Sequence, residues 1–200
     1  MPAASALARA IKAFAAVARR RRLRWYIFGG QAVAVHGRPR MTLDIDITIE
    51  LGDVALEDLL AELGRAGFEP RVRWSPAEVE LLRVVPVVHR ASRVPVDLVL
   101  AGEGLEAEFL TRARPVDLGG VRAPVISPED LVVTKLLAGR PQDRADVAGI
   151  LQHLRGKLDL DRVRGLLAEL ERALDQSDLT AGLDNLLAEV APSPRKPRRR

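Results

Sequence analysis

Short β-prone runs alternate with amphipathic helical stretches up to about residue 126, and every segment after that has a helical pattern. The helical stretches repeat apolar residues with a period near 3.6, whereas the β-prone runs alternate or are continuously apolar. This order indicates a mixed α/β (α+β) fold, with helices flanking a mixed sheet and a helical region after it. We predict an N-terminal helix over 1–23, an α/β core over 24–126, a C-terminal helical region over 127–190 and a basic disordered tail over 191–200.

Local start and stop signals predict the individual elements. Ser75, Pro76 and Glu78 form a capping box with proline at the first helical position. Gly119-Gly120 separates two short β-prone runs, which is typical of a hairpin. The predicted helices are 3–22, 31–37, 53–66 (with Asp53 as N-cap), a short one after Ser75, 103–112 and those after 127; the predicted strands are 24–28, 43–49, 68–74, 94–100, 114–118 and 121–125.

The composition excludes several classes of protein. With no cysteine, the 200-residue chain can form no disulfide, thiol nucleophile, iron–sulfur cluster or Cys-ligated zinc site. The three histidines are far apart and lack metal-ligand spacing. No apolar run is long enough to span a bilayer, and the N-terminus lacks a signal-peptide pattern. We therefore expect a cytoplasmic protein without membrane contact.

The formal net charge of +4 is unevenly distributed. Residues 192–200 hold five cations and no acid, and without them the acids outnumber the bases by one. This Pro-rich tail is either a solvated end or a contact for RNA or DNA phosphates. A second basic cluster, at residues 19–24, closes the first predicted helix, where cations complement the helix dipole.

Asp44 and Asp46 lie two residues apart in the predicted strand 43–49, so both carboxylates project from the same face. Two adjacent carboxylates repel each other unless a cation lies between them, and Mg²⁺ prefers such oxygen ligands. The simpler alternative is an edge strand on which both carboxylates face solvent.

Asp97 interrupts the apolar run VPVDLVL, whose composition predicts a buried strand. A buried carboxylate without a partner is costly, and a metal shared with Asp44 and Asp46 would explain this residue. Three carboxylates from two strands suit a two-metal site for in-line phosphoryl displacement. A hydrogen-bonded structural aspartate is the alternative.

Gly29-Gly30 stands between a predicted strand and a predicted helix, shortly before the two aspartates. Glycines let backbone amides approach a ligand closely, and the start of a helix presents free N–H groups to phosphate. A tight strand-to-helix turn without a ligand is the alternative.

Lys135 lies beside leucines on a predicted helix, where an ammonium group is costly unless it faces an anionic site. Asp143 and Asp146, three residues apart on the next helix, share a face and could hold Arg140 or Lys135 in place. Ordinary surface ion pairing is the alternative.

The order Gly29-Gly30, Asp44-Ile45-Asp46 and then Asp97 resembles the nucleotidyltransferase superfamily with the DNA polymerase β-like fold. The stretches GRPRMTLDIDI and SPEDLVVTKLLAGRPQDRADV are closest to the AbiEii/AbiGii toxin-type and related minimal nucleotidyltransferases. The resemblance covers residues 25–151. Many superfamily members have Gly-Ser where this chain has Gly29-Gly30, so one phosphate contact is missing here.

The resemblance implies a Mg²⁺-dependent enzyme, with two ions expected and Mn²⁺ as a substitute, that moves a nucleoside monophosphate from a nucleoside triphosphate (NTP) to an acceptor hydroxyl. The acceptor we expect first is tRNA or another RNA, because of the basic tail and the basic cluster at residues 19–24. A partner protein, such as a cognate toxin or antitoxin, comes second, and a small molecule third. A non-catalytic antitoxin or binding partner of the same fold is the alternative from another class. The implied roles are metal binding and catalysis for Asp44, Asp46 and Asp97, and nucleotide binding or its support for Gly29, Gly30, Gln31, Arg40, Thr42, Lys135, Arg140, Asp143 and Asp146.

Overall fold

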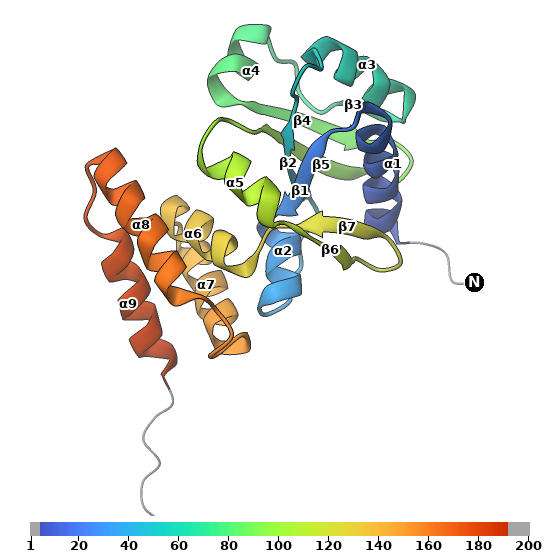
Figure 1. The fold of residues 1–200 in the computed structure, drawn as a ribbon. Helices are drawn as coiled ribbons and strands as arrows, with labels where there is room; N and C mark the ends of the chain where they lie inside the picture. Colours follow the sequence, from blue (N-terminus) through green and yellow to red (C-terminus); the bar gives the residue numbers. More distant parts are fainter. Residues whose placement is uncertain (1–4, 192–200) are drawn as a thin grey trace, which may run out of the picture. The chain divides into compact units, whose positions relative to one another are not determined.

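The structure is a computed structural model, and it describes residues 5–191 (Figure 1). The chain divides into two compact units. The first unit takes residues up to 127 except 35–38, and the second takes 35–38 and the residues from 128 onward. The predicted basic stretch at 192–200 lies outside the described residues.

The first unit is built on a mixed seven-stranded sheet, counted over the described residues, which confirms the predicted fold class. The strand order is β3-β4-β5-β2-β1-β7-β6. The pairs β2–β5 and β1–β7 are parallel, and the other four pairs are antiparallel. The strands are β1 (Arg24–Phe28), β2 (Ile45–Glu50), β3 (Phe68–Pro70), β4 (Val84–His89), β5 (Val94–Leu100), β6 (Arg114–Asp117) and β7 (Arg122–Val125).

Five helices of the described chain accompany these strands: α1 precedes β1, and the other four lie between strands. The first, α1, is capped by the Ser5 hydroxyl, which accepts a hydrogen bond from the Ala8 amide, and it ends before Arg22, whose φ of 55° is left-handed. The capping box at Ser75 is confirmed, with reciprocal hydrogen bonds between Ser75 and Glu78. The helices are α1 (Ala6–Arg21), α2 (Gly29–His36), α3 (Leu56–Arg65), α4 (Pro76–Leu82) and α5 (Leu105–Arg112).

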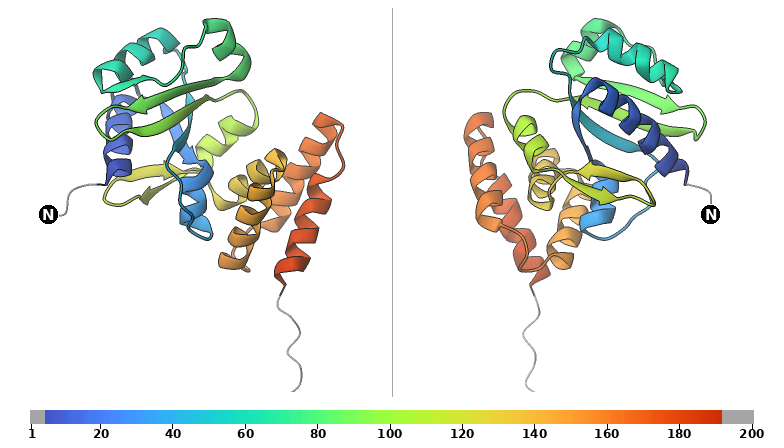
Figure 2. Two further views of the ribbon diagram at one scale, coloured as in Figure 1. Left: turned by 180° about the vertical axis from the view of Figure 1, so that it is seen from behind. Right: turned by 45° about the vertical axis from the view of Figure 1, so that its right-hand side comes forward.

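One face of the sheet is apolar and is covered by α1 and α3, which contact each other (Figure 2). The isoleucines of β2 alternate with Asp46 and Thr48, so Ile45, Ile47 and Ile49 share this face and are fully buried. From α1, the ring of Phe14 packs edge-on against Trp25 and Phe68. The alternation leaves Asp46 and Asp97 on the opposite face.

Several predicted boundaries are wrong. Strand β2 begins at Ile45, so Asp44 precedes the strand, and α2 begins at the two glycines rather than after them. Helix α3 begins after Ala55 without a side-chain cap, so Asp53 is not its N-cap. The predicted strand 68–74 ends at Pro70.

Strand β4 has no counterpart among the predicted elements. Pro86 interrupts its apolar run, and proline argues against a central strand because it cannot donate a hydrogen bond to the sheet. The sheet accommodates this residue between β3 and β5, where Pro86 is paired with Asp97 and its carbonyl accepts a hydrogen bond from the Arg71 amide.

The described part of the second unit is helical, as predicted. Its helices α8 and α9 pack on each other, and both contact α6. The apolar faces of α8 and α9 meet in this core. No helix in the described part of the chain is long and apolar enough to cross a membrane. The helices are α6 (Pro128–Ala138), α7 (Pro141–His153), α8 (Leu160–Leu174) and α9 (Leu179–Val190).

Candidate active site

Three carboxylates converge on the sheet face opposite to α1. Asp46 of β2 and Asp97 of β5 are direct partners in the parallel pair, so their side chains lie on the same face. Asp44 lies two residues before Asp46. One carboxylate oxygen from each aspartate lies within 4.8 Å of the other two, and all three residues are half-buried. The structure thus brings together the three aspartates predicted as metal ligands.

Asp97 is less buried than the sequence suggests. Its neighbours Val96 and Leu98 point into the core, whereas the Asp97 side chain is 25% exposed. The run VPVDLVL is apolar on both faces, and this concealed the alternation of burial along β5. Solvent on one side leaves the carboxylate accessible to a ligand.

Arg71, which the sequence analysis did not single out, donates a hydrogen bond from Nη2 to Asp97 Oδ1 at 2.6 Å. It lies directly after β3, in a stretch predicted to be strand. No local pattern joins Arg71 to Asp97, because they are 26 residues apart and meet only through the antiparallel pairings of β3 with β4 and of β4 with β5.

Asp44 is oriented by two residues that were predicted to bind nucleotide. The Thr42 hydroxyl donates to Asp44 Oδ1 at 2.6 Å, and the Gln31 side-chain amide donates to the Asp44 carbonyl at 3.2 Å. These bonds hold the segment before β2 against the start of α2. Arg40, in the same segment, is exposed.

The two glycines at the start of α2 lie against the carboxylates. Gly29 follows Phe28, the register partner of Asp46, and has a φ of +61°. A Cβ at Gly29 would lie 1.7 Å from Asp46 Oδ2, and a Cβ at Gly30 would lie 2.7 Å from the Thr42 hydroxyl oxygen. The space therefore requires glycine at both positions. The first amides of a helix have no intrahelical acceptor, so anion-binding groups lie beside the acidic cluster.

The donor set fits a hard divalent cation. Carboxylate oxygens are the preferred ligands of Mg²⁺ and Mn²⁺, and three of them converge here at a half-exposed site. Arg71 brings one positive charge against three carboxylates. Negative charges this close repel one another, and a cation bound between them relieves the repulsion.

The other predicted residues form a cluster within the second unit. The Lys135 ammonium lies 2.7 Å from Asp143 Oδ1 and 3.0 Å from Asp146 Oδ2, and all three side chains are buried. Arg140 also binds Asp143, at 2.6 Å. Burial raises the pKa of Asp143, but hydrogen bonds from Arg140 and Lys135 outweigh it and hold that pKa below its usual value of 3.8. The predicted support of Lys135 by the two aspartates thus exists as contacts, whereas its role toward a triphosphate stays a prediction.

Asp46 and Asp97 on adjacent strands, Asp44 just before the first of them and a glycine pair that opens a helix are the arrangement that the sequence analysis associated with nucleotidyltransferases. The chain belongs to the family described as nucleotidyltransferase of unknown function (DUF6036), whose model matches residues 5–186. The predicted superfamily and the prediction of an enzyme of this class are thereby confirmed. No curated protein matches the chain.

Solved structures share the fold at low sequence identity. The complex of ANT(2″)-Ia with adenylyl-2″-tobramycin has a TM-score of 0.57 at 16% identity, covering 85% of this chain and 99% of that one. The solution structure of the antibiotic-resistance factor ANT(2″)-Ia has a TM-score of 0.54 at 14% identity, covering 82% and 92%. An antigenic nucleotidyltransferase-like protein from Paracoccidioides brasiliensis has a TM-score of 0.53 at 17% identity, covering 92% and 95%.

Proposed function

We propose that this protein transfers a nucleoside monophosphate from an NTP to an acceptor hydroxyl and releases pyrophosphate. The convergence of Asp44, Asp46 and Asp97 within 4.8 Å carries the proposal. In the reaction the acceptor oxygen forms a bond to the α-phosphorus, and the bond from that phosphorus to the bridging oxygen of pyrophosphate breaks. The acceptor proton passes to a base in the site.

The carboxylates would divide two tasks. Asp44 and Asp46 would hold Mg²⁺, and Asp97 would complete the metal site and receive the proton of the attacking hydroxyl. Bound Mg²⁺ would neutralise charge on the triphosphate during in-line displacement. Thr42 would keep Asp44 oriented through its hydrogen bond to Oδ1.

The start of α2 would hold the phosphates. Gly29 and Gly30 leave the backbone amides open, and Gln31 ties this turn to Asp44. Arg40 would reach a phosphate from the segment before β2. In the second unit, Lys135 would contact the triphosphate, with Arg140, Asp143 and Asp146 as its support.

The acceptor we favour is RNA, with a protein or a small molecule as alternatives. The basic cluster at residues 19–24 no longer supports RNA, because Arg21 binds Glu62 at 2.7 Å and Arg24 binds Glu50 at 3.0 Å. A small molecule is the second candidate, because ANT(2″)-Ia, which shares the fold, was solved in complex with adenylyl-2″-tobramycin. Closeness to the AbiEii/AbiGii branch and a toxin–antitoxin role stay predictions.

The test is incubation of the protein with each α-labelled NTP, Mg²⁺ and total tRNA. Wild type should release pyrophosphate and label an acceptor, and Asp46→Asn should do neither while unfolding at the same temperature. Asp53→Asn, which changes an exposed turn residue, is the matched control and should behave as wild type. Equal incorporation by Asp46→Asn would refute the assignment of the site.

A further inference from the structure

A row of paired residues across the sheet gives the candidate site two distinct ends. The register aligns Pro86 of β4 with Asp97 of β5, Asp97 with Asp46 of β2, and Asp46 with Phe28 of β1. Gly29 follows Phe28 at one end of this row. At the other end, the Arg71 amide donates to the Pro86 carbonyl, and its side chain reaches back to Asp97.

In-line displacement assigns a role to each end. If the amides at the start of α2 hold the triphosphate, pyrophosphate leaves toward Gly29. The attacking hydroxyl must then approach from the opposite side of the α-phosphorus, which is the side of Asp97 and Arg71. This step rests on the proposed function.

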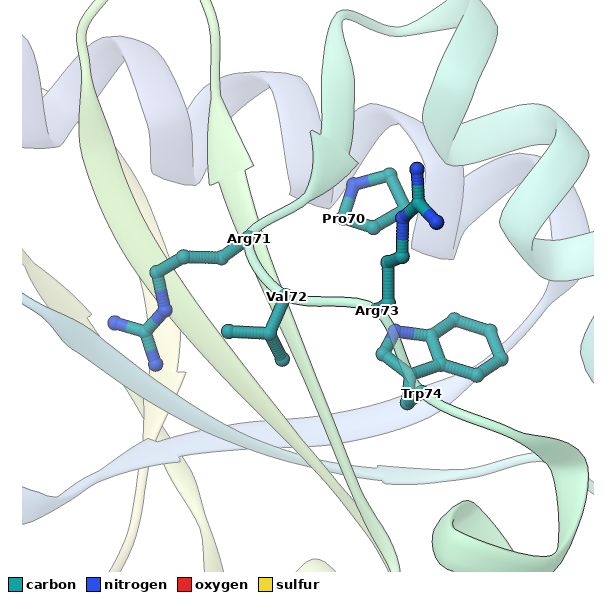
Figure 3. Close-up of a pocket in the computed structure, with 5 residues that line it drawn as sticks. All are labelled: Pro70, Arg71, Val72, Arg73 and Trp74. Atoms are coloured by element: carbon teal, nitrogen blue, oxygen red, sulfur yellow. The ribbon is translucent and has the colours of Figure 1, made fainter.

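The segment at that second end, residues 70–74, lines an open hollow of about 520 Å³ (Figure 3). Its sequence Pro-Arg-Val-Arg-Trp brings two guanidinium groups and an indole. Figure 3 shows the Arg71 side chain extending to one side, while Arg73 and Trp74 lie together on the other. Both arginines are exposed and Trp74 is half-buried.

The charges around the segment favour an anionic ligand. Of the acids that flank the segment, Glu69 lies 3.9 Å from the Arg90 guanidinium. Glu78 is turned to the helix cap, where its carboxylate accepts hydrogen bonds from the Ser75 amide and hydroxyl. Asp97 is bound to Arg71, and a cation held by Asp97 would leave the other N–H groups of Arg71 for phosphate. An acceptor with several ammonium groups would meet two guanidinium groups here.

The indole adds a surface for a flat ring. Its Nε1 is buried and makes no hydrogen bond among the described residues, so packing alone holds the ring in place. Aromatic side chains next to arginines bind single-stranded nucleic acids, because bases stack on the ring while the backbone phosphates meet the cations.

We infer that residues 70–74 bind the acceptor and that this acceptor is the end of a single RNA strand. Arg71 and Arg73 take its phosphates, Trp74 stacks on a base, and the terminal hydroxyl lies toward Asp97. The side of the carboxylates that is left to the attacking group thus gives the place of the acceptor, and the two arginines and the indole that line this side give its chemical class.

The test uses the full chain and a 12-nucleotide, fluorescein-labelled single-stranded RNA that ends in 4-thiouridine. Arg73→Glu and Trp74→Ala should each weaken RNA binding by about tenfold, measured by fluorescence anisotropy. Their affinity for Mg²⁺–ATP should stay unchanged. Arg122→Glu, which changes an exposed arginine of β7, is the matched control and should bind RNA as wild type. Arg71 is kept, because it contacts Asp97.

Photocrosslinking distinguishes RNA binding at residues 70–74 from RNA binding at other basic parts of the chain. The thiouridine should crosslink to the tryptic peptide 74–83, which begins with Trp74. A crosslink only elsewhere, equal RNA binding by both variants and the control, or binding of tobramycin in place of RNA would overturn the inference. Failure of the proposed function is a different result, in which wild type binds none of the four NTPs with Mg²⁺, whatever its affinity for RNA.

Discussion

Gly29 and Asp46 approach so closely that no side chain can stand between them: a Cβ at position 29 would lie 1.7 Å from Asp46 Oδ2. The glycine therefore shapes the acidic cluster as well as the turn into α2. Together with the left-handed φ of +61° at Gly29, this contact makes the position sensitive to a single methyl group.

Gly29→Ala should abolish Mg²⁺-dependent pyrophosphate release, because the new methyl group would displace the Asp46 carboxylate. The left-handed backbone adds about 1–2 kcal/mol of strain. Gly64→Ala in α3 is the control, since nothing lies within 4 Å of a Cβ there, and it should keep wild-type activity and be at least as stable as wild type. Normal turnover by Gly29→Ala would contradict the placement of Asp46 at the reaction centre.

Thr42→Val should raise the Mg²⁺ concentration needed for half-maximal activity by about tenfold, because Asp44 loses the hydroxyl that orients it. Thr42→Ser keeps a hydroxyl and should recover most of the difference. Titration of activity with Mg²⁺ at saturating NTP measures the effect. A change in thermal stability with no change in Mg²⁺ dependence would assign Thr42 a structural role instead.

Lys135→Met should lower the free energy of unfolding by about 3–5 kcal/mol, because two buried carboxylates lose the ammonium group between them. Urea unfolding at neutral pH measures the loss. Adding Asp146→Asn to Lys135→Met removes one of the two buried negative charges and should restore part of the stability. If the double variant is no more stable than Lys135→Met, the loss does not come from charge.

Acid should weaken this same cluster. The pKa of Asp143 is below its usual value of 3.8 in the folded protein. The ionised Asp143 side chain therefore contributes its full stabilisation above pH 3.8, and this stabilisation is lost as the pH falls through the pKa of the folded state. Asp143→Asn should be less stable than wild type at pH 7, and the difference should shrink in strong acid. Urea unfolding at both pH values measures it, and a difference independent of pH would refute the ion pairing.

The free energy of unfolding should fall on mild acidification because of His89. Burial, with a smaller effect of the Arg9 charge, lowers its pKa below the usual 6.5. The unfolded chain then binds a proton first, so stability declines as the pH drops from 6.5 through the folded-state pKa. His89→Leu should remove this slope, and the exposed His153→Leu should keep it. Unfolding temperatures between pH 7.5 and 5.5 measure it, and an unchanged slope in His89→Leu would contradict the assignment.

Local pattern was enough to predict the elements whose signals are contained in a few residues. Alternation placed Asp46 opposite the buried isoleucines, because side chains in a strand alternate between faces. Two short sequence motifs were confirmed as well: the capping box at Ser75 and the glycine pair that turns the hairpin of β6 and β7. The spacing of Asp143 and Asp146 predicted that they share a face and contact Arg140 or Lys135, and in the structure both bind Lys135 while Asp143 also binds Arg140.

The sequence by itself determined which faces are apolar, which residues are acidic and where helices replace strands, since these follow from local periodicity and side-chain chemistry. Only the tertiary structure decided that β2 lies beside β5, which places Asp46 against Asp97, and that a proline-containing β4 fits next to them. It also brought Arg71 to Asp97. Strand partners distant in sequence are selected by the packing of the whole sheet, and no short pattern encodes that choice.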